Sequence, residues 1–183
     1  MKELSLNILD ITENSVKAGA TLTEILLEQT ADTLTLTVRD DGCGMDAETV
    51  RRVTDPFYTT RTTRPVGMGL PLLRLAAEQT GGGLTVTSRT DEYHGTEVQA
   101  VFYTDHIDCP PLGDVIATLV TLVQGHPYTD FLFCHRRPDL PTVEVDTREL
   151  RQVLEDVPLN SYEVLSWFQG YLEEAYAATE ADE

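Results

Sequence analysis

The chain of 183 residues is short of cysteine, of positive charge and of long apolar runs. Its three cysteines are an odd number without a Cys-x-x-Cys pair, which argues against a disulfide framework or a zinc site and favours a reduced, intracellular protein. The longest apolar stretch, residues 115–123, is interrupted by two threonines and falls short of the roughly 20 residues of a membrane span. No signal-peptide pattern opens the sequence. We therefore expect a cytoplasmic protein with no membrane partner.

Positive charge is scarce throughout, with 13 Lys and Arg against 31 Asp and Glu and a net charge of −18. The imbalance grows along the chain. Residues 1–104 hold 9 basic and 15 acidic side chains, whereas residues 105–183 hold 4 and 16. Such a surface repels phosphate backbones, so nucleic acid is not expected as a partner. Simple solvation accounts for most of this charge, and a docking surface in the acidic second part is the alternative.

The first part of the sequence alternates between helical and strand patterns. Apolar residues recur at helical spacing first, and strands, a short helix that Asp46 can cap, a second helix and a strand hairpin follow. These elements are expected at residues 3–18, 21–28, 33–39, 46–53, 71–80, 84–89 and 96–103. The pattern predicts an α+β fold, a two-layer α/β sandwich in which helices cover one side of a mostly antiparallel sheet.

A change in composition at Ile107-Asp108-Cys109-Pro110-Pro111 suggests a boundary. We expect one domain over residues 1–106 and a small C-terminal α+β extension over residues 107–183. Its predicted helices and strands lie at residues 112–124, 130–135, 142–145, 147–155 and 161–178. An apolar stripe on the last helix is expected to pack into the core, and binding of a partner or a second copy is the alternative. The stripe consists of Tyr162, Leu165, Phe168, Tyr171 and Leu172.

Asp10 and Asn14 lie four residues apart in the first predicted helix, so their side chains share one face. The carbonyl oxygen of an Asn side chain is a suitable hard ligand for Mg²⁺, which prefers few protein ligands together with phosphate oxygens. A carboxylate one turn earlier could orient or deprotonate a hydroxyl or a water. The alternative is an exposed polar helix face without a ligand.

The segment Asp40-Asp41-Gly42-Cys43-Gly44 directly follows a predicted strand. Glycines at 42 and 44 permit a tight turn and a close backbone approach to a ligand. Asp40 could accept a hydrogen bond from an exocyclic amine such as adenine N6, and a buried acceptor of this kind discriminates by about 10⁴–10⁵. An ordinary turn at the end of a strand is the alternative.

A third glycine motif, Gly67-Met68-Gly69-Leu70, leads into a predicted helix. Glycines at a helix N-terminus let backbone N–H groups and the helix dipole face a phosphate, although a bare Gly-x-Gly is common. The loop before it, residues 58–64, supplies hydroxyl groups and two arginines, which suit phosphate contacts. Gly95-Thr96 opens the last strand of this part and could place a hydroxyl near an adenine.

In order and spacing these motifs resemble the GHKL superfamily, the ATP-binding domains of histidine kinases, gyrase-type topoisomerases, MutL and heat-shock chaperones. Glu13-Asn14-Ser15-Val16-Lys17-Ala18-Gly19-Ala20 is similar to the N box, and Asp40, Gly42 and Gly44 match the G1 box. Asp55-Pro56-Phe57-Tyr58-Thr59-Thr60-Arg61 resembles the F box of sensor kinases. Gly67 and Gly69 match the G2 box, and Gly95-Thr96 matches the last box. The resemblance covers roughly residues 3–104 and implies a Bergerat ATP-binding fold.

The resemblance also implies the cofactors, ATP and Mg²⁺, and a role for each matched residue. Asn14 would be the metal ligand, Asp40 the reader of adenine and Asp10 the catalytic residue. Lys17, Met45 and Thr96 would join the nucleotide site. The implied cofactor-binding residues are Asn14, Lys17, Asp40, Gly42, Gly44, Met45, Phe57, Thr60, Arg61, Arg64, Gly67, Met68, Gly69, Leu70 and Thr96.

Two departures from the family pattern bear on function. The N box lies almost at Met1, whereas a sensor kinase carries its phosphoacceptor histidine in a helical domain ahead of it. All four histidines of this chain follow Asn14, and each is expected to be an ordinary surface or core residue. Asp10 stands where histidine kinases tend to have Asn and where hydrolytic members and GHKL serine kinases have Glu.

The resemblance implies a stand-alone protein kinase, histidine-kinase-like or serine-kinase-like, which transfers the γ-phosphate to a partner protein. The partner would be a protein substrate or a regulatory protein, and a homodimer is left open. The alternative is a nucleotide-gated interaction module or a slow ATPase without kinase activity. A DNA-repair or topoisomerase-like ATPase is disfavoured by the acidic second part and by the F box.

Overall fold

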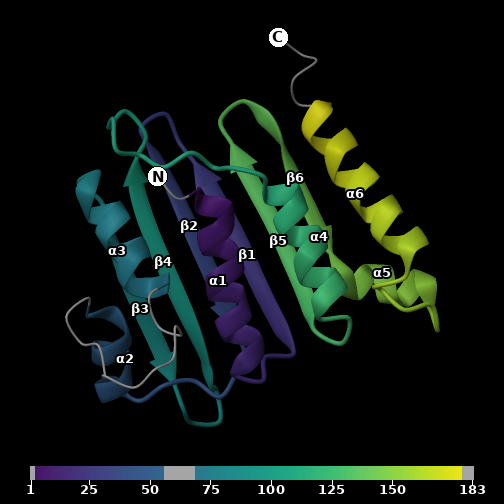
Figure 1. Cartoon of the computed structure of the whole chain (residues 1–183), viewed down its shortest axis with the longest axis horizontal. Helices are drawn as coiled ribbons and strands as arrows, with labels where there is room; N and C mark the ends of the chain where they lie inside the picture. Colours follow the sequence, from purple (N-terminus) through teal and green to yellow (C-terminus); the bar gives the residue numbers. More distant parts are fainter. Residues whose placement is uncertain (1–2, 56–68, 179–183) are drawn as a thin grey trace.

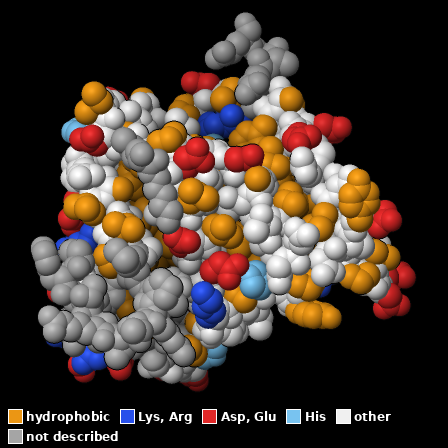
Figure 2. All heavy atoms as spheres, viewed as in Figure 1, with side chains coloured by type: hydrophobic (Ala, Val, Ile, Leu, Met, Phe, Trp, Pro, Cys, Tyr) orange, Lys and Arg blue, Asp and Glu red, His pale blue; other side chains and the backbone are white. Residues whose placement is uncertain are grey.

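The computed structural model describes residues 3–55 and 69–178. Six strands form one sheet in the order β3-β4-β2-β1-β5-β6, and α1, α3 and α4 lie across one face of it (Figure 1). The same helical face carries more acidic than basic side chains in the space-filling view (Figure 2). The position of these helices on one face of the sheet confirms the expected two-layer arrangement. None of the helices described combines the length and apolar character needed to cross a lipid bilayer.

The elements run in chain order from the first helix to the last. They are α1 (Leu4–Lys17), β1 (Leu22–Gln29), β2 (Thr33–Asp40), α2 (Ala47–Thr54), α3 (Gly69–Gln79), β3 (Gly83–Arg89), β4 (Gly95–Tyr103), α4 (Val115–Gly125), β5 (Asp130–Arg137), β6 (Leu140–Asp146), α5 (Thr147–Leu154) and α6 (Tyr162–Ala177). The expected cap of α2 is present, since Asp46 Oδ1 accepts a 2.7 Å hydrogen bond from the Thr49 N–H. The bonds from Thr49 lower the pKa of the Asp46 carboxyl below its usual value.

Helix α1 forms because its apolar residues recur every three or four positions. Leu4, Ile8 and Ile11 are almost fully buried against the sheet. Asn14 and Lys17 lie on the exposed side. The helix therefore has one face fixed in the core, and its polar residues remain available near its C-terminal end.

The sheet is apolar on the helical face and polar on the other, as one-sided antiparallel sheets commonly are. In β1, Ile25 and Leu27 are fully buried. On the opposite face the Arg39 side chain bonds Glu97 at 2.6 Å and Glu24 at 3.2 Å across neighbouring strands. Because these side chains are substantially exposed, we expect the ion pairs to add little stability.

The second part of the chain continues the same sheet. Strand β5 pairs with β1 in parallel, and β6 pairs with β5 antiparallel. The predicted strands at residues 130–135 and 142–145 are present. Among the described strands four of the five pairings are antiparallel, as expected of a mostly antiparallel sheet. The parallel pairing of β5 with β1 was not predicted, because the partner of a strand is chosen by tertiary packing. Leu122 of α4 and Phe168 of α6 lie in one core cluster with Ile8. The division at residues 106 and 107 stays a prediction, while one core extends across it.

The linker between the two parts explains where α4 begins. The carbonyl oxygens of Pro111 and Leu112 accept hydrogen bonds of 2.9 and 2.8 Å from the N–H groups of Leu4 and Ser5. This segment therefore caps the first turn of α1, whose N–H groups have no partner within the helix. It cannot be helical at the same time, so α4 starts at Val115 with Asp114 as its cap rather than at residue 112.

We expect Phe168→Ala to lower the free energy of unfolding by about 3–5 kcal/mol, because this ring is 1% exposed in the shared core. Since the core is shared, Trp167 emission and far-UV circular dichroism should report one coincident transition during denaturation. The exposed Gln169→Ala variant should stay within about 0.5 kcal/mol of the parent protein. Two separated transitions would contradict a single cooperative unit.

Candidate functional site

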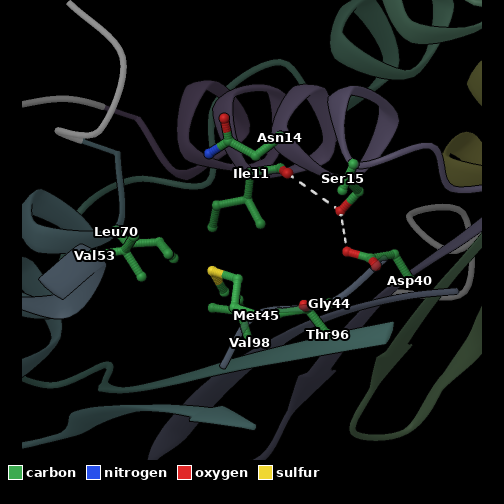
Figure 3. A pocket seen from close by; sticks show the side chains of 11 residues that line it. Ile11, Asn14, Ser15, Asp40, Gly44, Met45, Val53, Leu70, Thr96 and Val98 are labelled. Atoms are coloured by element: carbon green, nitrogen blue, oxygen red, sulfur yellow. Dashed lines mark hydrogen bonds between the residues drawn. The ribbon is translucent and has the colours of Figure 1, made fainter. Parts of the chain in front are cut away.

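A cavity of about 250 Å³ opens between α1, α2, α3 and the ends of β2 and β4. Its volume is just below the range of about 300–1,000 Å³ that is common for small-molecule sites. Four polar and seven apolar or glycine residues line it: Asn14, Ser15, Asp40 and Thr96, and Ile11, Ala18, Gly44, Met45, Val53, Leu70 and Val98. The apolar side chains of Val53 and Leu70 lie opposite Asp40 and Ser15 (Figure 3). This polarity suits a flat ring with hydrogen-bonding groups at one edge.

The Asp40 carboxylate is fixed from two sides. Ser15 Oγ donates a 2.6 Å hydrogen bond to Asp40 Oδ2, and the Gly42 N–H donates one of 2.9 Å to Oδ1 (Figure 3). Ser15 is 3% exposed, so its hydroxyl is held in place between α1 and β2. A carboxylate has about four acceptor positions. Asp40 therefore keeps capacity to accept an N–H from a ligand in the cavity.

The adjacent Asp41 has a different role. Its carboxylate accepts hydrogen bonds from the Thr21 N–H at 2.7 Å, from the Leu22 N–H at 3.0 Å and from the Thr21 hydroxyl. Partial burial raises the pKa of Asp41, but these hydrogen bonds outweigh it and the pKa lies below its usual value. Asp41 thus ties the loop after β2 to the start of β1, and only Asp40 lines the cavity.

Glycine is required where backbone segments meet beside the cavity. Gly44 has φ +74°, and a Cβ there would collide with the Arg89 carbonyl oxygen. Gly42 is buried, and a Cβ there would lie 2.9 Å from the Ala18 Cβ. These close approaches hold the loop after β2 against α1 and against the β3–β4 hairpin.

Two residues that the motifs did not single out hold this loop as well. Ser88 Oγ accepts the Met45 N–H at 2.7 Å and lies 2.7 Å from Thr96 Oγ1. His94 Nδ1 lies 2.6 Å from the Gly42 carbonyl oxygen and donates to it. His94 is at the surface as expected, yet it contacts the glycine motif. The register of the β3–β4 hairpin pairs Ser88 with Thr96, and the position of Ser88 near the site could have been predicted from that pairing.

Helix α1 carries the three other polar residues named from the sequence. Asn14 lines the cavity and is exposed, whereas the exposed Lys17 is not among the lining residues. Asp10 is half-buried and lies against the first residue of α3, since a Cβ on Gly69 would be 3.4 Å from the Asp10 Cβ. A carboxylate near a helix N-terminus is favoured by the helix dipole. Asp10 and Asn14 thus lie where α1, α3 and the cavity meet.

Of the sixteen residues predicted for the site, the structure gathers Asn14, Asp40, Gly44, Met45, Leu70 and Thr96 in the cavity lining. Gly42 supports Asp40 from behind, and Asp10 and Gly69 adjoin each other nearby. Six predicted residues lie outside the described residues: Phe57, Thr60, Arg61, Arg64, Gly67 and Met68. The role of each residue in binding ATP stays a prediction.

The donor set around the cavity fits a magnesium ion bound mainly through a nucleotide. No three His, Cys, Asp or Glu side chains within residues 3–55 and 69–178 come together in a way that could hold a metal ion. The Asn14 side chain supplies one neutral oxygen at the cavity rim, and Mg²⁺ commonly takes one or two protein ligands with phosphate oxygens and waters. Asn14 is therefore compatible with the predicted metal role.

The adjacent Cys134 and His135 of β5 belong to no metal-binding cluster among the described residues. Both residues are buried, and His135 Nδ1 lies 2.9 Å from the Tyr176 hydroxyl. Burial, together with the charge of Arg137, lowers the pKa of His135 to about 4. The imidazole is therefore neutral near pH 7, and His135 is a core residue, one of the two environments expected for the histidines.

Residues 2–106 match the family described as histidine kinase-, DNA gyrase B- and HSP90-like ATPase. The sensor histidine kinase YvrG of Bacillus subtilis (strain 168) is 35% identical over 95 residues, which are 49% of this chain and 16% of YvrG. The chain covers 15% to 18% of the length of three curated relatives that it matches. The aligned region in these relatives is therefore one part of a larger protein.

Two solved structures share the fold. The N-terminal domain of a DNA repair protein gives a TM-score of 0.58 at 16% identity, covering 79% of this chain and 52% of that one. The ATPase domain of Aquifex aeolicus MutL complexed with ADP gives 0.52 at 14% identity, covering 81% and 67%. At these identities the likeness concerns the fold alone, and it confirms the expected Bergerat-type two-layer arrangement.

We expect Gly44→Ala to destabilise the protein by about 2–4 kcal/mol, because the added Cβ meets the Arg89 carbonyl and the backbone has a positive φ. The matched control is Gly83→Ala, where nothing lies within 4 Å of the added Cβ. That variant should change the stability by less than about 1 kcal/mol. Urea denaturation of both variants measures the difference, and equal effects would contradict the assigned close packing.

Proposed function

The chain belongs to the histidine kinase-, DNA gyrase B- and HSP90-like ATPase family, and from that premise we propose that it binds Mg-ATP and transfers the γ-phosphate to a partner protein. The proposal rests on one observation: a single cavity is lined both by Asp40, whose carboxylate is held in place, and by Asn14, whose side-chain oxygen is a suitable ligand for Mg²⁺. Asp10 lies one helical turn before Asn14. Together these residues supply the means to select a base, hold phosphates and accept a proton.

Asp40 would select the base. Its two oxygens are already bonded by Ser15 and Gly42, so the carboxylate cannot turn away from the cavity without losing both bonds. An adenine N6 amine can donate to it, whereas a carbonyl at the same place would repel it. The apolar lining, including Met45 and Val98, offers the faces between which an adenine ring can be buried.

Asn14 would hold the metal through its side-chain oxygen. A bound Mg²⁺ supplies charge neutralisation to the phosphates of the nucleotide. The N-terminal end of α3 adds the positive end of a helix dipole close to Asp10. The predicted phosphate contacts from Arg61, Arg64 and Gly67 belong to this proposal and lie outside the described residues.

Transfer requires a nucleophile on the partner. In the proposed step an oxygen of a partner hydroxyl forms a bond to the γ-phosphorus while the bond from that phosphorus to the β–γ bridging oxygen breaks, and ADP leaves. Asp10 takes the proton of the hydroxyl. A histidine acceptor would use its unprotonated ring nitrogen and would not need this base. The acidic residue at position 10 therefore favours a hydroxyl acceptor. The proposed reaction takes place in the cytoplasm.

Hydrolysis is the second candidate function, and it is Asp10 that supports it. A carboxylate placed beside the phosphates can activate a water in the same way as a hydroxyl. The same residues would then form a slow ATPase, and the phosphate would be released rather than transferred. The two functions differ in product, which makes them separable by experiment.

The test is incubation of the purified protein with γ-labelled ATP and Mg²⁺ in extract of its own host. We expect a labelled partner band that is absent with Asn14→Ala. Asp10→Asn should lower transfer to a hydroxyl by about 10²–10⁴-fold, the usual contribution of a general base, while ATP affinity changes by less than about threefold. Label that survives acid would assign a hydroxyl acceptor.

The outcomes that contradict the kinase proposal are distinct from one another. Free labelled phosphate without a labelled protein would establish an ATPase. Bound ATP with neither product would leave a nucleotide-gated interaction module. A band that persists in Asn14→Ala would show that the label comes from a contaminating kinase.

A further inference from the structure

A second concave surface lies in the C-terminal part, between α5 and α6. It encloses about 490 Å³, and apolar residues provide all but one of its lining side chains. The main lining residues are Leu150, Val153 and Leu154 from α5, Val157 from the connecting loop, and Val164 and Trp167 from α6. We name this surface the α5–α6 groove. It shares no residue with the nucleotide cavity and stands independently of the proposed function.

Several apolar side chains of the groove are exposed to solvent and are not packed into the core. Leu159 and Phe168 beside it are 1% exposed and complete the packing of this region. Val153 is nevertheless 82% exposed, Val157 48% and Trp167 53%. Exposed apolar side chains that gather in one concave surface, rather than lying singly, mark a candidate binding site.

Acidic residues outnumber basic ones in the segment that forms the groove. Residues 147–177 hold two arginines and six Asp or Glu residues. Both arginines are already used, since Arg148 Nη2 lies 2.7 Å from Asp146 and Arg151 Nε lies 2.7 Å from Asp130. In Figure 2 the right-hand edge of the molecule, where α5 and α6 lie, shows apolar side chains bordered by acidic ones.

Four acidic residues that line the groove or adjoin its lining residues in the sequence form what we call the acidic rim, and none of them has an ion-pair partner among residues 3–55 and 69–178. Within the described residues, Glu149, Glu155, Asp156 and Glu163 take part in none of the ion pairs. Glu163 also lines the groove directly. The rim therefore presents a negative potential around an apolar floor.

We propose that the α5–α6 groove binds a protein segment with an apolar helical face flanked by Lys and Arg. Apolar anchors at helical spacing would fill the groove, as in other helix-in-groove complexes. The basic side chains would meet the acidic rim, which sets partner choice and association rate. A second copy of this chain does not fit, because residues 105–183 hold 4 basic and 16 acidic side chains and two such surfaces repel each other.

Trp167 is the anchor that the groove presents in a fixed position. Its ring stacks on Tyr171 with centroids 5.5 Å apart and planes 18° from parallel. The Tyr171 hydroxyl donates a 3.0 Å hydrogen bond to the Glu144 carbonyl oxygen of β6. Aromatic side chains held in this way lose little freedom on binding and often dominate interface energies. Trp167 is also the only tryptophan of the chain, so its emission reports on the groove alone.

The test is a titration of the full chain with a synthetic Leu/Lys peptide whose leucines recur at helical spacing. Trp167 emission should shift to shorter wavelength as the half-exposed ring is covered. Binding should weaken as the salt concentration rises above about 0.15 M, because the rim contribution is electrostatic. A Ser/Lys peptide and a Leu/Glu peptide should each bind at least about tenfold more weakly, since each lacks one of the two features.

A matched pair of variants locates the site. Val153→Ser removes an apolar contact from the groove without changing its charge, and it should weaken the Leu/Lys peptide about tenfold. Ile107→Ser, at a residue 90% exposed and outside the groove, should change the affinity by less than about twofold. Neither substitution touches the core, so both variants should fold with the parent circular dichroism spectrum.

Several results would overturn the proposal. These are an absence of Leu/Lys binding, equal binding of the Ser/Lys or Leu/Glu peptide, and equal losses in Val153→Ser and Ile107→Ser. A concentration-dependent emission shift without peptide would instead assign the groove to a second copy of the chain. None of these readouts depends on nucleotide, so they are separate from the fate of the kinase proposal.

Discussion

The hydrogen bonds that hold Asp40 are the constraint on which the site depends. Ser15 reaches it from α1 at 2.6 Å, and the Gly42 N–H reaches it from the loop after β2 at 2.9 Å. These contacts join the helix that carries Asp10 and Asn14 to the strand that ends at the cavity. A charge-assisted bond from a buried hydroxyl is among the stronger hydrogen bonds in proteins, and losing either partner leaves a polar group without compensation. The cavity therefore keeps its shape because α1 and β2 keep their spacing.

The C-terminal part contributes to the same constraint through α4. This helix packs on α1, where Thr118 Oγ1 donates a 3.2 Å hydrogen bond to the Ser5 carbonyl oxygen and His126 Nε2 lies 2.7 Å from Glu13 Oε1. Strand β5 extends the sheet beneath it by pairing with β1. The second part of the chain thus braces the helix of the site, while its far edge presents the α5–α6 groove. One core cluster therefore extends from the cavity lined by Asp40 to the part of the chain that carries the α5–α6 groove.

Sequence reasoning located the residues whose roles are local and missed those whose roles depend on packing. Asn14, Asp40 and Thr96 were found because each lies in a short motif at a helix or strand end, and the structure brings them to one cavity. Ser88 and His94 were not found, because their contacts with Met45 and Gly42 require the hairpin to fold back on the loop. The parallel pairing of β1 and β5 was missed for the same reason. On α6, the apolar period predicted the burial of Phe168 but not the exposure of Tyr162, since a helix pattern does not say how much of its stripe a neighbour covers.

The central claim is that a fixed Asp40 selects adenine, and calorimetric titration with ATP and GTP tests it most directly. The account predicts that the parent protein binds ATP at least about 100-fold more tightly than GTP, because a guanine carbonyl would face the carboxylate where adenine presents its amine. In Asp40→Asn most of that preference should disappear, since the amide can donate as well as accept. The parent stability should be kept to within about 2 kcal/mol. Equal binding of ATP and GTP by the parent protein, or an unchanged preference in Asp40→Asn, would contradict the account.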